Sequence, residues 1–189
     1  MQCESINRRM HRDIVMKTIL VTGGIASGKT EVCNYVASMG FDVYDSDSRT
    51  KALYASVPGL KEKAEEAIGC PLESAAAVVF SDPQALSRLE SVVYPEVLAD
   101  FMAWRNSRRG DVVFFESAVA LEKEIFNHLW DEVWLVVAPL ESRMKRNAKV
   151  RERIGAQRTV DPAEADIVIV NDSTIGELHE KIDRLIKTI

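Results

Sequence analysis

Cysteine is scarce in this sequence, and no apolar run is long enough to cross a bilayer. The 189 residues include only Cys3, Cys33 and Cys70, an odd number with wide spacing. Such a set offers neither a disulfide framework nor the paired ligands of a zinc site, and it favours a reducing cytoplasm. Because no apolar stretch approaches the ~20 residues that span a membrane, we expect no membrane partner.

The beginning of the chain also lacks a hydrophobic stretch. Residues 1–15 are basic and precede an apolar run that begins at Met16, so we interpret them as a disordered leader rather than a secretory signal. The net charge of −5 excludes a chain that is basic overall. No cluster of aromatic residues suggests a surface for stacking bases. We therefore expect no nucleic-acid partner, and any anion site must be built locally.

Short apolar runs alternate with helical patterns along the rest of the chain. The whole sequence has 47% hydrophobic and 28% charged residues, the composition of a globular protein, and we expect one domain over 16–189. Nearly continuous apolar strands separated by helices predict an α/β fold of three layers, α/β/α, around a five-stranded parallel sheet. We expect helices at 29–39 and 175–189 and strands at 17–23, 41–47, 111–117, 131–139 and 165–172.

A long helical stretch separates the second and third predicted strands. Residues 48–109 have a mostly helical pattern that is interrupted at "VPG" (57–59) and "GCP" (69–71). Residues 82–109 have the pattern of one helix or of two, with Pro95 marking the break, because proline removes a helical hydrogen bond. We interpret 48–109 as an insert that binds and covers the substrate, within a single domain that spans 16–189.

The segment "VTGGIASGKTEVC" (21–33) contains the spacing Gly-x4-Gly-Lys-Thr between a predicted strand and a predicted helix. This is the context in which a P-loop binds a nucleotide. Glycines let several backbone N–H groups point at one phosphate, and the positive end of the helix adds to the field. Lys29 would reach the outer phosphates of ATP, and the Thr30 hydroxyl would bind Mg²⁺. The predicted loop residues are Gly23, Gly24, Ile25, Ala26, Ser27, Gly28, Lys29 and Thr30.

Carboxylates follow the second and third predicted strands. Asp45 and Asp47 lie at the carboxyl end of the second strand, where ligands bind in open α/β sheets. One of them could accept the proton of an attacking hydroxyl while the other holds the metal, directly or through water. Alternatively, Ser46 or Asp47 simply caps the next helix. Glu116 ends the third strand at the same edge, as a metal or substrate ligand or as a solvated strand end.

An arginine-rich segment follows the fourth predicted strand. Residues 141–160 contain several arginines and lysines, among them Arg143 and Arg146. Cationic helices are usually solvated surfaces, but arginines on a short lid also neutralise charge on a phosphoryl group in transfer. We predict Arg146 as a catalytic residue together with Lys29, and Arg143 as a nucleotide-binding residue.

The motifs together resemble one family. "TGGIASGKTEVCNYVASMGFDVYDSD" (22–47) resembles the opening of dephospho-coenzyme A kinases, in which a TGGI-type P-loop is followed at this distance by D-x-D. "LESVVYPEV" (89–97), "FFESAVALE" (114–122), "RERIGAQ" (151–157) and "ADIVIVND" (165–172) are similar to later family motifs in the same order. The resemblance extends from Lys17 to the C-terminus.

The resemblance implies a kinase that uses ATP and Mg²⁺ to phosphorylate the ribose 3′-hydroxyl of dephospho-coenzyme A. The products are coenzyme A and ADP, in the last step of coenzyme A biosynthesis. It also implies that Asp47 is the general base and that Asn171 lies at the adenine site. The acceptor-binding residues it implies are Asp45, Tyr94, Glu116 and Gln157.

The sequence departs from the family pattern mainly in its acceptor half. Tyr94 replaces the histidine that precedes the family's proline, Ser74 stands where an arginine is usual, and the lid is several residues shorter. Two alternatives therefore remain: a P-loop kinase for another nucleoside or small alcohol, and a non-catalytic ATP-binding relative. We expect a monomer or a weak homo-oligomer.

Overall fold

The centre of the molecule is a parallel β-sheet. The computed structural model describes residues 16–148, 150–153 and 159–189, so the predicted leader and Gln157 lie outside the described residues. All neighbouring strands of the five-stranded sheet are parallel, in the order β2-β3-β1-β4-β5. The predicted parallel sheet is therefore confirmed. Its strands are β1 (Lys17–Thr22), β2 (Asp42–Asp45), β3 (Val112–Glu116), β4 (Glu132–Val137) and β5 (Ile167–Val170).

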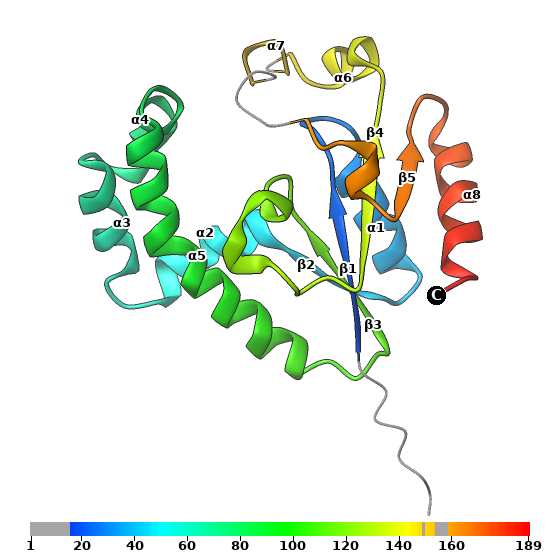
Figure 1. Ribbon diagram of the computed structural model, residues 1–189, viewed down its shortest axis with the longest axis horizontal. Helices are drawn as coiled ribbons and strands as arrows, with labels where there is room; N and C mark the ends of the chain where they lie inside the picture. Colours follow the sequence, from blue (N-terminus) through cyan, green and yellow to red (C-terminus); the bar gives the residue numbers. More distant parts are fainter. Residues whose placement is uncertain (1–15, 149, 154–158) are drawn as a thin grey trace, which may run out of the picture.

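One face of the sheet is covered by α1 (Lys29–Ser38) and α8 (Ile175–Ile186) (Figure 1). Alternate residues of β1 point to opposite faces, so Ile19 and Val21 pack on this side. They join one buried cluster with Val32 of α1 and Leu178 of α8. This cluster fixes the position of α1, whose first turn contains the predicted P-loop lysine and threonine.

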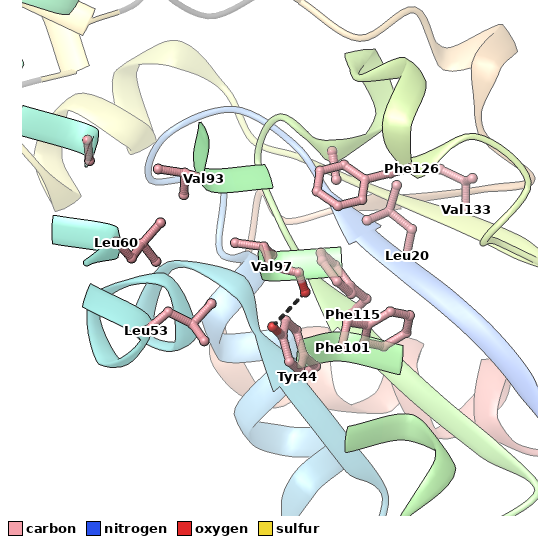
Figure 2. Packing of buried hydrophobic residues seen from close by; sticks show 12 residues of the cluster. Leu20, Tyr44, Leu53, Leu60, Val93, Val97, Phe101, Phe115, Phe126 and Val133 are labelled. Atoms are coloured by element: carbon pink, nitrogen blue, oxygen red, sulfur yellow. Dashed lines mark hydrogen bonds between the residues drawn. The ribbon is translucent and has the colours of Figure 1, made fainter. Parts of the chain in front are cut away.

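The opposite face packs against the helices of the insert. Leu20 of β1 and Phe115 of β3 join a second buried cluster with Val97 and Phe101 from α5 (Pro83–Asn106). Figure 2 shows this packing, with the Tyr44 hydroxyl of β2 donating to the Val97 carbonyl over 3.3 Å. Helices on both faces confirm the predicted three-layer α/β/α fold.

The region predicted as an insert contains four α-helices and one 3₁₀ turn. The predicted interruptions at 57–59 and 69–71 fall between helices. Of the two alternatives for 82–109, the single helix is correct and the break at Pro95 is not, because α5 continues through this residue. Val93 and Val97 on either side of the proline are buried, and their packing outweighs the local cost of about 3 kcal/mol. Besides α5, the elements are α2 (Ser46–Ser56), α3 (Leu60–Ile68), η1 (Leu72–Ser74) and α4 (Ala75–Ser81).

Short elements surround the carboxyl ends of the strands. The arginine-rich segment forms α6 (Leu140–Arg146) and α7 (Val150–Arg153), which lie above the ends of β1 and β4 in Figure 1. Three 3₁₀ turns complete the connections: η2 (Ala120–Glu122), η3 (Glu124–Phe126) and η4 (Pro162–Glu164). In the described part of the chain, no helix combines the length and apolarity required to cross a bilayer.

Candidate active site

The loop between β1 and α1 has a backbone conformation that depends on glycine. Gly23 has φ of +141° and Gly28 has φ of +108°, values that residues with a side chain rarely adopt. A Cβ on Gly23 would lie 2.2 Å from the Val136 carbonyl oxygen, and one on Gly28 would lie 2.2 Å from Nδ2 of Asn171. The two glycines are thus required both by their backbone angles and by close packing against β4 and the end of β5.

The P-loop lysine lies in this loop, mostly out of contact with solvent. Lys29 Nζ donates to the Gly24 carbonyl over 3.3 Å. Burial lowers the pKa of Lys29, and the nearby carboxylates of Glu116 and Asp47 act in the opposite direction. The Lys29 ammonium is therefore close to two acidic side chains from different elements. Phosphoryl transfer uses such a set, in which the lysine binds phosphate oxygens, one acid helps to hold the metal and the other accepts a proton.

Glu116 is the carboxylate that directly contacts the P-loop helix. Its Oε1 accepts a 2.6 Å hydrogen bond from the Thr30 hydroxyl. The strand order explains this contact, because β3 pairs with β1 and Glu116 is level with Val21. Burial raises the pKa of Glu116, and the bond from Thr30 partly opposes that effect. A buried carboxylate next to the P-loop hydroxyl is suited to a divalent cation.

The two aspartates of the D-x-D motif have different environments. Asp45 caps α2, because its Oδ1 accepts from the N–H groups of Asp47 and Ser48 at 3.1 Å each. Its Oδ2 accepts a 2.5 Å bond from the Ser48 hydroxyl. The cap that was the alternative interpretation of Ser46 or Asp47 is therefore made by Asp45. Asp47, in the first turn of α2, is exposed and keeps its carboxylate available.

Asp47 faces a cleft of about 340 Å³ between the sheet and the insert. Tyr94 lines the same cleft, and burial raises its pKa, with Glu90 and Asp47 adding to the shift. The Tyr94 hydroxyl donates to Glu90 over 3.0 Å, and Glu90 forms a 2.7 Å ion pair with Lys123. The lining residues are Ser46, Asp47, Thr50, Lys51, Tyr54, Tyr94, Val97, Ser117, Val119 and Phe126.

The two predicted lid arginines both contact the backbone of the P-loop. Arg143 Nε donates to the Ile25 carbonyl over 2.8 Å. Arg146 Nη1 donates to the carbonyls of Ala26 and Ser27 at 3.3 and 3.2 Å. These bonds place both guanidinium groups beside the loop that is predicted to hold the phosphates.

Asn171 connects the end of β5 to the same loop. Its buried side chain donates to the Ser27 carbonyl over 2.8 Å and accepts from Arg146 Nη2 over 3.2 Å. Its backbone N–H donates to the Val137 carbonyl over 2.7 Å. The contacts observed for Asn171 are thus with the P-loop itself, and its role beside adenine remains a prediction.

Sequence reasoning overlooked two residues at the site. Cys33 is buried one turn after Lys29, and its thiol donates a hydrogen bond to Glu116. Lys51 lines the cleft four residues after Asp47, a helical spacing that could have identified it. Of the predicted site residues, Gln157 alone is not described, and the structure brings the others to the carboxyl edge of the sheet. Their catalytic roles remain predictions.

Comparisons with known proteins place this geometry in one family. A scan of family models found no match to the chain. The dephospho-CoA kinase of Porphyromonas gingivalis is 37% identical over 139 residues, which cover 69% of this chain and 68% of that protein. The chain belongs to the dephospho-CoA kinase family. The dephospho-CoA kinase of Burkholderia lata is 30% identical over 190 residues, covering 90% and 94% of the two chains.

Solved structures agree with the observed fold. The crystal structure of TT1252 from Thermus thermophilus has a TM-score of 0.74 and 31% identity, covering 92% of this chain and 97% of that one. The dephospho-CoA kinase from Campylobacter jejuni has a TM-score of 0.54 but only 16% identity, covering 91% and 96%, so it supports the fold alone. The family assignment confirms the resemblance seen in the sequence, and with it an ATP-dependent kinase.

Proposed function

We propose that this protein transfers the γ-phosphoryl group of ATP to the ribose 3′-hydroxyl of dephospho-coenzyme A, giving coenzyme A and ADP. One observation carries the proposal beyond the family name. The exposed carboxylate of Asp47 is near enough to Lys29 of the P-loop for its charge to act to raise the pKa of that lysine, and Asp47 also lines the adjoining cleft. A proton acceptor thus lies between the predicted phosphate site and a cavity that can hold an alcohol.

The P-loop supplies the phosphate site. The curled backbone from Gly23 to Gly28 and the start of α1 provide N–H groups and a positive helix end. Ser27 adds a hydroxyl that is buried and makes no hydrogen bond within the described chain. A buried hydroxyl without a partner is costly, and a phosphate oxygen would satisfy it. These features support ATP as the phosphoryl donor.

The residues beside the loop fit Mg²⁺ bound together with ATP. The Thr30 hydroxyl donates a hydrogen bond to Glu116, which leaves the lone pairs of the threonine oxygen available for a cation. The described residues contain no cluster of three acidic, histidine or cysteine ligands, in keeping with Mg²⁺ sites that take phosphates and waters as further ligands. When bound, the ion would offset the negative charge of the outer phosphates. Thr30 would hold it directly, with Glu116 or Asp45 acting through water.

Asp47 removes the proton in the proposed reaction. The 3′-hydroxyl oxygen attacks the γ-phosphorus as its O–H bond breaks, and the Asp47 carboxylate takes the proton. The bond between the γ-phosphorus and the β,γ-bridging oxygen breaks, and ADP leaves with that electron pair. Lys29 stabilises the charge on the outer phosphate oxygens, and Arg146, which already contacts the loop backbone, is placed to do the same after a side-chain rotation.

Mass spectrometry can test the assignment directly. The protein is incubated with dephospho-coenzyme A, ATP and Mg²⁺, and the expected product has gained one phosphate at the 3′ position. The Lys29→Ala variant serves as the control and should give no product. If the wild-type protein phosphorylates another nucleoside or alcohol but leaves dephospho-coenzyme A unchanged, the proposed acceptor is wrong.

A further inference from the structure

Lys51 is an exposed lysine on the cleft wall formed by α2. It is the only lysine or arginine among the residues that line this cleft. Within the described ranges, its ammonium makes no ion pair or hydrogen bond. The only other charged residue of the lining is Asp47, the proposed base. The cleft therefore carries one proton acceptor and one unengaged positive charge.

Other cations in the described part of the chain are already engaged. Arg49 of the same helix donates two bonds to Asp100, from Nε at 2.8 Å and from Nη2 at 2.5 Å. Arg143 and Arg146 are bonded to P-loop carbonyls on the nucleotide side. Lys123 is paired with Glu90 on the far side of Tyr94. With Lys29 assigned to ATP, Lys51 is thus, among the described residues, the cation that remains for a ligand entering the cleft.

Its spacing from Asp47 fits the shape of the acceptor. Residues i and i+4 lie on one face of a helix, separated by about 6 Å of rise. In a nucleotide, the ribose 3′-hydroxyl and the 5′-diphosphate are separated by about the width of the ribose ring. An acceptor whose 3′-hydroxyl meets Asp47 would therefore bring its 5′-diphosphate to the next turn of α2, where Lys51 lies.

We propose that Lys51 binds the diphosphate of the acceptor and so selects nucleotides over uncharged alcohols. The inference rests on the proposed function, because it takes dephospho-coenzyme A as the acceptor. A lysine ammonium has three donors and suits the several oxygens of a diphosphate. The proton acceptor, Asp47, and the anion-binding group, Lys51, then lie on consecutive turns of one helix.

Calorimetry and steady-state kinetics on Lys51→Ala test this proposal. Dissociation constants for dephospho-coenzyme A are measured without ATP, at low and high salt, and KM and kcat are measured with Mg²⁺ and ATP. We expect Lys51→Ala to weaken dephospho-coenzyme A binding by about tenfold, the size of a lost charge-assisted hydrogen bond. The KM for the acceptor should rise similarly, while kcat and the KM for ATP stay within about twofold of wild type.

Two further variants sharpen the comparison. Lys51→Arg keeps the positive charge and should bind nearly as well as wild type. Lys187→Ala removes another exposed lysine, beyond the end of α8, and should leave acceptor binding unchanged. Salt should weaken acceptor binding less in Lys51→Ala than in wild type, because one screened charge pair is missing.

The outcomes separate this inference from the proposed function. If Lys51→Ala binds dephospho-coenzyme A as tightly as Lys187→Ala does, Lys51 has no role in the diphosphate site. A fall in kcat with an unchanged acceptor KM would also contradict the inference, because it would indicate a role in chemistry or folding. If the wild type binds dephospho-coenzyme A but does not phosphorylate it, the proposed function fails while the binding comparison still decides the role of Lys51.

Discussion

The Thr30 hydroxyl donates a 2.6 Å hydrogen bond to Glu116 Oε1, and this contact joins the first turn of α1 to the end of β3. Both side chains come from elements that are fixed by the buried core, so the distance between them is set by the fold. The bond orients the threonine oxygen and keeps the buried carboxylate satisfied. It is therefore the natural place to test the proposed metal site.

We expect Glu116→Gln to weaken Mg²⁺ binding by about 10- to 100-fold, the usual cost of losing a group that orients a metal ligand. The glutamine can still accept the Thr30 hydrogen bond but carries no charge for the ion. A Mg²⁺ titration of turnover at saturating ATP measures the shift. Thr30→Ser keeps the hydroxyl and is the matched control. An unchanged Mg²⁺ midpoint in Glu116→Gln would remove Glu116 from the site.

Asp47→Asn should lower kcat by at least ~10²-fold, the lower end of general-base effects. Asparagine keeps the size of the side chain but cannot take the proton of the 3′-hydroxyl. An assay coupled to ADP release measures the rate, with ATP binding expected to remain near wild type. Asp111→Asn, an exposed aspartate just before β3, is the control. Turnover by Asp47→Asn close to that of wild type would rule out Asp47 as the base.

Gly28→Ala should abolish ATP binding, whereas Gly40→Ala should only reduce stability. Both glycines have positive φ, so alanine is strained at either position by about 1–2 kcal/mol. At Gly28 the new Cβ also meets Asn171 Nδ2 at 2.2 Å, while at Gly40 it meets no atom within 4 Å. The shift of the thermal midpoint on adding ATP measures binding in each variant. An equal ATP shift in the two variants would contradict the proposed importance of the Asn171 contact.

Asp100→Asn should destabilise the protein by about 1–2 kcal/mol near pH 7, a value reduced for the partial exposure of the pair. Burial acts to raise the pKa of Asp100, but the hydrogen bonds from Arg49 and Tyr44 outweigh it and hold the pKa below its usual value. Because the pKa of Asp100 is lowered in the folded state, its ionised carboxyl stabilises the protein at pH values above the pKa of the unfolded carboxyl, about 3.9. That stabilisation is lost as the pH falls through the folded pKa.

The free energies of unfolding of wild type and Asp100→Asn should therefore differ most at neutral pH and converge below about pH 4. Urea unfolding across this range measures the difference. Asp172→Asn, which removes an exposed partner of Lys181, should have little effect at any pH. A difference that does not depend on pH would indicate that the charge of Asp100 contributes nothing.

The strands were predictable because each combines an apolar run with a clear end. Glycine follows Thr22 and polar groups follow Val112–Glu116, so the predicted bounds differ from the observed ones by only a few residues. The P-loop was equally clear, since its glycines and lysine have a spacing that few other structures require. Local pattern was thus sufficient to predict the loop that is proposed to bind the nucleotide.

Tertiary packing decided what the sequence left open. Local chemistry predicts a break at Pro95, but the buried flanks of α5 keep the helix continuous. The contacts of Arg143 and Arg146 with the loop depend on where α6 lies, which no local pattern specifies. The sequence suggested Ser46 or Asp47 as a possible cap of α2, but Asp45 makes the cap, because the helix begins directly after it. These features need the arrangement of elements in space.

Pro95 has a structural consequence for the insert. The carboxyl-terminal half of α5 is tied to the sheet and to α2 through Asp100, which binds Tyr44 and Arg49. Proline leaves out one rung of the helical ladder, the bond to the carbonyl of Ser91. The backbone of α5 therefore lacks a hydrogen bond next to Tyr94, which lines the cleft, while the half that carries Asp100 is held to the sheet.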